Sequence, residues 1–366
     1  MSDYQLQKKQ DYTLRTRNIL SELPKFCTLY FRDIEPTTSI LTRYGYAVDL
    51  RSFFTFLTSG EIAQFRDITM QDLKASDLDS LNALDISLYL EHVSLYKKQT
   101  ADGEKLMENN ERAKARKLSA IRALFKFLYK NGMIQQNCAA LVDTPKLHEK
   151  AIIRLDANEV ADLLDNVEQG GGLTKQQRAF HDATKLRDVA ILTLFLGTGI
   201  RISELVGTNL NDFDFANDRF VVTRKGGNQM TLAFGVEVRN ALLAYLEERK
   251  TVIPLAGHED AFFLSMQRKR ITPRAVENLV KKYAKLTTPL KKITPHKLRS
   301  TYGTMLYQES GDIYLVADVL GHKDVNTTRK HYAAMTEEKS RQAAKYIKLR
   351  EEQAEPVPIP NENIDQ

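Results

Sequence analysis

The sequence has few cysteines, no long apolar run and no spacing of ligands typical of a metal site. Only Cys27 and Cys138 occur among the 366 residues, far apart and without a His/Cys pattern that suggests zinc. Two thiols cannot cross-link a chain of this size, so we expect a reducing compartment. No run approaches the roughly 18 apolar residues of a membrane span, and residues 1–18 lack the apolar stretch of a secretory signal. These absences predict a cytoplasmic protein without a membrane segment.

The composition is that of an ordinary globular protein, with 42% hydrophobic and 27% charged residues. A chain of 366 residues is long enough for two domains, each with its own core. The net charge of +6 favours an anionic partner without identifying one. The position of the charge along the chain is therefore more informative than its sum.

Helical spacing of apolar residues predicts three helices in the first part of the chain, over residues 38–57, 85–96 and 112–130. The polar, glycine-containing stretch 97–111 is predicted to be a mobile loop. The pattern stops at a Pro-containing segment around residues 139–151. We therefore expect a domain over residues 1–140, a linker over 141–152 and a second domain over 153–335.

The helix over 112–130 carries seven cations and no acidic residue, which is unusual because surface helices normally mix charges of both signs. One interpretation is a solvated basic face. The alternative is a helix that contacts DNA phosphates. On the second interpretation the candidate DNA-binding residues are Arg112, Lys114, Arg116, Lys117, Arg122 and Lys126. The seventh cation of this helix is Lys130.

The second part of the chain is predicted to be mainly helical with one small antiparallel element. Two strand-like runs, 219–224 and 229–234, are separated by a Gly-Gly turn and predict a β-hairpin. The stretch 170–177 lacks the ending of a P-loop and is predicted to be a connecting loop. Helices are expected over residues 156–168, 185–196, 236–250, 272–286, 295–309, 312–320, 327–334 and 336–353, before a Pro-rich, acidic tail without regular structure.

Two cations stand at sharp turns of this second part. Arg201 follows Gly197-Thr198-Gly199, where glycines allow the chain to turn from one helix into the next. It could project into a site, or it could simply pair with Glu204 or Asp188. Lys225 lies at the tip of the predicted hairpin, where a lysine is either solubilising or able to reach into a groove.

Four further residues follow in two short motifs. In TPHKLRS, Thr294 is a plausible N-cap, and His296 and Arg299 share a face at the positive end of a helix, which suits anion binding. In LGHKDVNTTRKHY, His322 follows a helix closed by glycine, and Tyr332 comes ten positions later. Each residue alone has a structural explanation. Together two arginines, a lysine and two histidines could surround a phosphodiester, and a tyrosine could attack it.

The order Arg201, Lys225, His296-x-x-Arg299, His322, Tyr332 resembles the catalytic pattern of the tyrosine recombinase (phage integrase) family and covers roughly residues 185–335. The basic helix ARKLSAIRALFKFLYKNG is similar to the core-binding domain of the Xer branch. The chain length, the segment before residue 38 and the insertion at 97–111 resemble its longer single-recombinase type. The resemblance implies a mainly α, two-domain, C-shaped DNA clamp that joins a helical core-binding domain to a catalytic domain.

The resemblance also implies the chemistry. Arg201 and Arg299 would clamp the phosphodiester, because guanidinium groups stay protonated and match phosphate oxygens. Tyr332 would be the nucleophile that forms a 3′-phosphotyrosine link, with His296 as base. Lys225 would protonate the departing 5′ oxygen, and His322 would bind a non-bridging oxygen or position Tyr332. No cofactor and no metal are expected.

The implied partners are double-stranded DNA carrying a specific site and three further copies of this chain. A homotetramer would hold two DNA sites and exchange strands through a Holliday junction. The amphipathic helix over 336–353 could dock on a neighbouring protomer or pack on its own chain. A division-linked DNA translocase is a possible activating partner.

The leading hypothesis is a site-specific recombinase that resolves chromosome dimers. An integrase or excisionase of a mobile element would share its chemistry. A type IB topoisomerase would share it too, although the basic helical domain argues against that enzyme. A non-catalytic DNA-binding protein would explain the basic helix but not the six reactive side chains.

Overall fold

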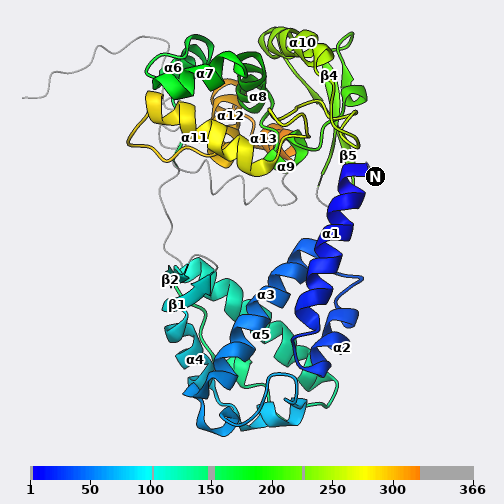
Figure 1. The fold of residues 1–366 in the computed structure, drawn as a ribbon, viewed down its shortest axis with the longest axis vertical. Coiled ribbons are helices and arrows are strands. Elements are labelled where there is room, and N and C mark those ends of the chain that lie inside the picture. The colour runs from blue at the N-terminus through cyan, green and yellow to red at the C-terminus, as the bar shows by residue number, and fades with distance from the viewer. Residues whose placement is uncertain (1–2, 101–102, 147–152, 225–226, 322–366) are drawn as a thin grey trace, which may run out of the picture. The chain divides into compact units, whose positions relative to one another are not determined.

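The computed structural model describes residues 3–100, 103–146, 153–224 and 227–321. These residues are mainly helical with two small antiparallel sheets, which confirms the predicted fold class, and the chain divides into two compact units near residue 151 (Figure 1). No helix in these four ranges is long and apolar enough to cross a membrane. The predicted helices over 327–334 and 336–353 and the site residues Lys225, His322 and Tyr332 lie outside the described residues.

The described residues of the first unit form a bundle of five α-helices. They are α1 (Asp3–Leu20), α2 (Lys25–Asp33), α3 (Ile40–Phe56), α4 (Ala83–His92) and α5 (Glu111–Lys130). Short turns of π- or 3-10 helix cover Leu57–Glu61, Ala63–Phe65, Ala75–Ser80 and Cys138–Leu141. The predicted helices over 38–57 and 112–130 agree closely with α3 and α5, whereas α4 ends four residues before the predicted end. The sequence analysis did not predict α1 and α2.

Polar caps and an aromatic core explain this bundle. The Ser39 side chain accepts a hydrogen bond from the backbone N–H of Thr42 at the start of α3, and Asn110 caps α5 in the same way. Phe53 of α3 is fully buried, and its ring meets those of Tyr89 in α4 and Phe125 in α5 edge-on. The apolar stripe of α5 therefore faces the core.

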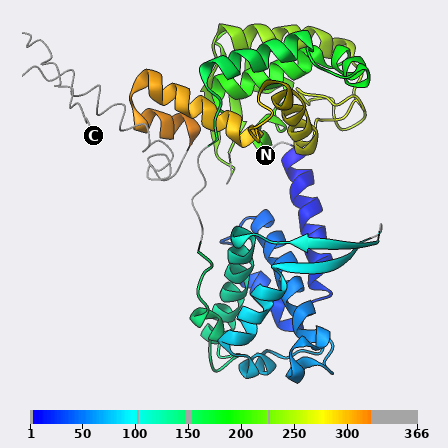
Figure 2. The same ribbon diagram turned by 90° about the vertical axis from the view of Figure 1, so that its left-hand side faces the viewer.

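The predicted mobile loop over 97–111 is wrong: most of it forms a β-hairpin. Strands β1 (Leu95–Thr100) and β2 (Gly103–Glu108) pair antiparallel, with Tyr96 opposite Met107. Asn109 closes its base, because its side chain donates to the carbonyl of Val93 at 2.7 Å. The hairpin projects beyond the helices of this unit (Figure 2). Its polar composition concealed the alternation on which a strand prediction depends.

The second unit surrounds the buried helix α8. Its helices are α6 (Ala157–Gln169), α7 (Lys175–Asp182), α8 (Lys185–Thr198), α9 (Ile202–Leu205), α10 (Val236–Thr251), α11 (Pro273–Thr287), α12 (Pro295–Ser310) and α13 (Ile313–Leu320), with a 3-10 turn at Leu210–Asp212. The helices α6, α10 and α12 pack on α8 (Figure 1). The predicted connecting loop over 170–177 is right up to residue 174, after which Thr174 caps α7.

The predicted hairpin belongs to a three-stranded sheet. Strand β4 (Arg219–Thr223) pairs with β5 (Gln229–Ala233), as expected, and also with the short strand β3 (Phe213–Asp214), which the sequence analysis missed. Aromatic rings hold the sheet on the rest of the unit, with ring centroids of Phe213 and Phe262 only 4.2 Å apart. The sheet therefore fixes the position of β4, and Arg224 follows directly after its last residue.

Candidate active site

The junction between α8 and α9 places Arg201. Gly199 ends α8 in a left-handed conformation with φ of +62°, and a Cβ there would collide with the ring of Tyr302 and come within 2.9 Å of Leu320. Only glycine fits both the backbone and the space. The chain then turns so that Arg201 becomes the N-cap residue of α9, where its side chain contacts the C-cap residue of α13.

Arg201 is held by a carboxylate and by a carbonyl. Its Nη1 donates to Oε1 of Glu204 at 2.8 Å, and its backbone N–H donates to the other carboxylate oxygen at 3.0 Å. Its Nη2 donates to the carbonyl of Gly321 at 3.1 Å. The Glu204 side chain is 2% exposed, whereas that of Arg201 is 32% exposed. The predicted pairing with Glu204 is present, and it orients Arg201 without burying its charge.

Helix α12 places His296 and Arg299 at different depths. Thr294 is the N-cap residue and Pro295 the first helical residue, as predicted. His296 is exposed in the first turn, whereas Arg299 is 5% exposed. The Arg299 guanidinium donates through Nη1 to the carbonyl of Gly199 and through Nη2 to that of Leu320. One planar fork therefore joins the end of α8 to the end of α13.

The carboxyl end of α13 is where the arginines converge. Three consecutive carbonyls each accept a hydrogen bond from a different arginine: Val319 from Arg224 at 2.8 Å, Leu320 from Arg299 and Gly321 from Arg201 at 3.1 Å. The last carbonyls of a helix lack partners within it and carry partial negative charge, so they attract cations. This cluster, the α13 end, unites Arg201 and Arg299 with Arg224.

Arg224 is the member that the sequence analysis missed. It is the residue after β4 and stands next to Lys225 in the sequence. A single arginine at the base of a hairpin has no distinctive pattern, so no sequence signal pointed to it. Lys225, His322 and Tyr332 lie outside the described residues, so their predicted roles stay predictions. In sequence, Lys225 directly follows Arg224 and His322 directly follows Gly321.

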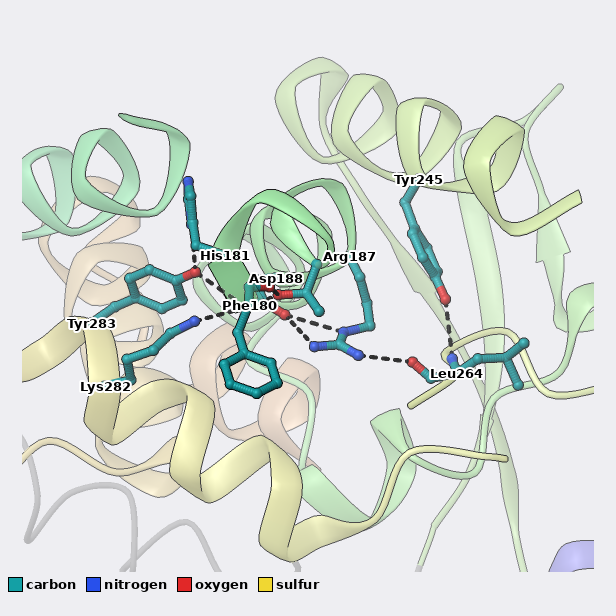
Figure 3. A network of polar contacts seen from close by, with 9 residues as sticks. Phe180, His181, Arg187, Asp188, Tyr245, Leu264, Lys282 and Tyr283 are labelled. Carbon is teal, nitrogen blue, oxygen red and sulfur yellow. Dashed lines mark hydrogen bonds and ion pairs between the residues drawn. The ribbon is translucent and has the colours of Figure 1, made fainter. Parts of the chain in front are cut away.

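A second buried polar cluster holds α8 from its other end (Figure 3). Asp188 accepts hydrogen bonds from Arg187 at 2.7 Å, from Thr184 at 3.0 Å and from the hydroxyl of Tyr283 at 3.1 Å. Lys282 lies 3.3 Å from the same carboxylate. Burial, followed by the charge of Asp188, raises the pKa of Tyr283. This network connects α8 to α11 and is structural, because its acceptors are already satisfied.

The basic helix α5 does not present all its cations to solvent. Lys117 is 7% exposed and lies 3.4 Å from Oδ1 of Asp49, a fully buried carboxylate on α3. Arg116 donates to Oδ2 of Asp49 at 2.5 Å, although its side chain stays 53% exposed. Burial raises the pKa of Asp49, while Lys117 and Arg116 act in the opposite direction. Lys117 therefore lies outside any surface of this unit that could contact DNA, contrary to the sequence analysis.

Two other predicted DNA-binding residues also have protein partners. Arg122 donates to Thr144 at 2.8 Å and to the carbonyls of Ala139 and Val142, so it fastens the segment after α5. Lys114 pairs with Glu111 at 2.7 Å. The remaining exposed members of the predicted set are Arg112, Arg116 and Lys126.

Comparison with known proteins identifies the family of the chain. Residues 153–339 match the profile of the phage integrase family. The chain is 33% identical over 295 residues to the tyrosine recombinase XerC of Caldanaerobacter subterraneus subsp. tengcongensis, which covers 78% of this chain and 75% of that protein. It is 29% identical over 356 residues to the tyrosine recombinase XerS of Lactococcus lactis subsp. cremoris, covering 90% of this chain and 98% of that protein.

The fold is shared with a solved recombinase. The structure of the XerH site-specific recombinase bound to a palindromic difH substrate superposes with a TM-score of 0.63 over 93% of this chain and 89% of that one, at 17% identity. That likeness shows a shared fold. The chain therefore belongs to the phage integrase family of tyrosine recombinases, the enzymes of site-specific DNA recombination, and within it to the Xer branch.

Proposed function

We propose that the protein cuts and rejoins DNA at a specific chromosomal site and thereby resolves chromosome dimers. The observation that carries this proposal is the convergence of Arg201 and Arg299 on the α13 end. The sequence leads from that end directly into His322. Two arginines from distant parts of the chain, which the family pattern assigns to a phosphate clamp, therefore contact the same helix end.

The clamp would stabilise the charge that develops on the phosphate. Attack on phosphorus places additional negative charge on the non-bridging oxygens, and fixed guanidinium groups stabilise that charge without rearranging. Within the described part of the chain, the Arg201 side chain makes hydrogen bonds to Glu204 and Gly321, which engage two of the five N–H groups that a guanidinium carries. Its partial exposure supports a role in contact with substrate.

The remaining steps are assigned by family pattern. The hydroxyl of Tyr332 would attack phosphorus and lose its proton to His296, because a phenol with a pKa of about 10 is protonated at neutral pH. The bond from phosphorus to the 5′ oxygen would break, and Lys225 would protonate that oxygen. His322 would bind a non-bridging oxygen. The 3′-phosphotyrosine ester retains the bond energy, so a second 5′ hydroxyl can reverse the step.

We also propose that residues 1–140 form the core-binding domain and 153–335 the catalytic domain. Double-stranded DNA would contact the exposed cations Arg112, Arg116 and Lys126 of α5. Recombination of two sites would need four copies of the chain, with the helix predicted over 336–353 as the contact between protomers. A division-linked translocase remains a proposed partner.

The nucleophile is the decisive test. On a nicked suicide substrate containing the host's replication-terminus recombination site, the wild-type protein should form a covalent adduct and Tyr332→Phe should bind without forming one. Tyr314→Phe is the matched control, because Tyr314 is 70% exposed on α13 and should be dispensable. An adduct that survives in Tyr332→Phe would contradict the assignment. Adducts only on DNA from the ends of a mobile element would indicate an integrase instead.

A further inference from the structure

Arg224 is bound to the α13 end from the direction of the sheet. Its Nη2 donates to the carbonyl of Val319 at 2.8 Å. Its Nη1 lies so close to Gly321 that a Cβ at that position would overlap it, and Gly321 has a φ of +59°. The glycine of the LGH motif therefore has two reasons to be glycine. The left-handed backbone ends α13, and the missing side chain admits the Arg224 guanidinium.

The surroundings of Arg224 are unfavourable for a residue that only stabilises the fold. Its Nε and Nη1 are buried and have no hydrogen-bond partner among the residues that the structure describes. Burial lowers the pKa of Arg224. The charge of Glu204 opposes this shift, the nearby charge of Arg201 adds a smaller lowering effect, and Asp318 opposes it least. Buried donors without acceptors are rare in native structures and often mark functional sites. This position combines two such donors with a second cation nearby.

The sequence neighbours of these contacts are the proposed proton-transfer residues. Arg224 directly precedes Lys225, and the segment Val319–Gly321 directly precedes His322. A hydrogen bond between residues 224 and 319 therefore joins the two backbone segments from which these side chains extend. A small displacement of either segment would be expected to slow the reaction severely, since catalytic groups tolerate little misplacement.

We propose that Arg224 is a positioning residue of the active site, which fastens the end of β4 to the last turn of α13 and so sets Lys225 and His322 in register with the Arg201–Arg299 clamp. The inference rests on the proposed function, because it assumes that Lys225 supplies the proton to the 5′ oxygen. Arg224 itself need not touch DNA.

The test uses full-length protein and two suicide substrates. One has an ordinary scissile phosphodiester, and the other has sulfur in place of the bridging 5′ oxygen. A thiol, with a pKa of about 8.5, is far more acidic than the 5′ hydroxyl, so a thiolate can leave without being protonated and the sulfur substrate bypasses the general acid. The variants are Arg224→Met, Arg224→Lys, Lys225→Ala and the double variant Arg224→Met/Lys225→Ala. Arg219→Met is the control, because Arg219 lies on β4 with its side chain 55% exposed.

Arg224→Met should slow adduct formation on the phosphodiester about 100-fold at saturating DNA, with unchanged DNA affinity and thermal unfolding. The sulfur substrate should remove most of that defect. The defects of Arg224→Met and Lys225→Ala should not multiply in the double variant. Arg224→Lys should be intermediate, and it replaces Arg224→Met in the comparison if the latter does not fold. The control should match the wild type.

Equal slowing on both substrates, or defects that multiply in the double variant, would show that Arg224 does not act through Lys225. A wild-type rate for Arg224→Met would also overturn the proposal. The failure of the proposed function has a separate signature. If the single variant Lys225→Ala forms adducts no faster on the sulfur substrate than on the phosphodiester, Lys225 is not the general acid. Arg224 then cannot be its positioning residue.

Discussion

In the first unit Arg116 and Lys117 meet a buried carboxylate, whereas in the second unit Arg201, Arg224 and Arg299 meet the carbonyl groups at the α13 end. Asp49 is fully buried within 3.4 Å of both cations, so its single negative charge offsets that of the buried Lys117, while Arg116 stays 53% exposed. The α13 carbonyls carry only partial charge, and Glu204 is the carboxylate bonded to Arg201. The first cluster therefore holds a buried cation against a carboxylate within the fold, while the second joins three guanidinium groups to three carbonyl groups and only one carboxylate.

Burial alone does not distinguish these functions. Arg249 is 5% exposed, as is Arg299, and donates to the carbonyls of Glu259 at 2.8 Å and Ala261 at 3.1 Å. It stands apart from the three arginines of the α13 end and fastens a turn. The convergence of several guanidinium groups from distant segments is therefore what identifies the candidate site.

The largest expected effect is on the first cluster. Asp49→Asn leaves Lys117 buried without its carboxylate, and breaking a buried ion pair costs about 3–5 kcal/mol of unfolding free energy. Hydrogen exchange of α3 and α5 amides is a suitable measurement, because the chain contains no tryptophan to report unfolding. The exposed pair Glu22–Arg51 is the control, and Glu22→Gln should cost less than about 1 kcal/mol.

A double variant would sharpen that result. Asp49→Leu with Lys117→Met removes both charges together, so much of the lost stability should return. If Asp49→Asn proved as mild as Glu22→Gln, the distinction between a structural and a functional charge cluster would fail.

The next effect concerns the clamp. Arg299→Lys keeps the charge but cannot hold the carbonyls of Gly199 and Leu320 with one planar fork. Adduct formation should fall about 10²–10³-fold, the usual cost of losing a preorganised donor to transition-state charge. Arg249→Lys is the matched control: its unfolding free energy should fall while the adduct rate of the folded protein stays unchanged. Equal loss of activity in both variants would contradict the comparison.

The smallest effect concerns DNA affinity. Arg112→Ala with Lys126→Ala removes two exposed cations of α5. The negative slope of log binding constant against log salt should therefore become shallower by about 2. Arg15→Ala is the control, since Arg15 is exposed and paired with Asp11 on α1. Titration at several salt concentrations measures the slope. An unchanged slope in the double variant would remove α5 from the proposed DNA surface.

Much of the fold was predictable because its signals are local. The apolar spacing and polar caps of α3 and α5, the Pro-initiated α12 and the glycine after α13 all follow from neighbouring residues. The hairpin over 95–108 was missed because its strands are polar, and α1 and α2 were not predicted. The strands β4 and β5 were predicted because both runs have residues typical of strands and a Gly-Gly sequence separates them.

The sequence by itself determined which residue types occur in which order, and that order identifies a recombinase. The sequence could not determine which cations form ion pairs or hydrogen bonds with other residues of the folded protein. Lys117 and Arg299 are both buried cations on helices, yet only tertiary contacts give one a carboxylate and the other the carbonyls of two distant segments. Only the tertiary structure identified Arg224 as a member of the cluster, because its partner Val319 lies 95 residues away along the chain. Electrostatic roles depend on distances in space, and those arise only when the helices pack.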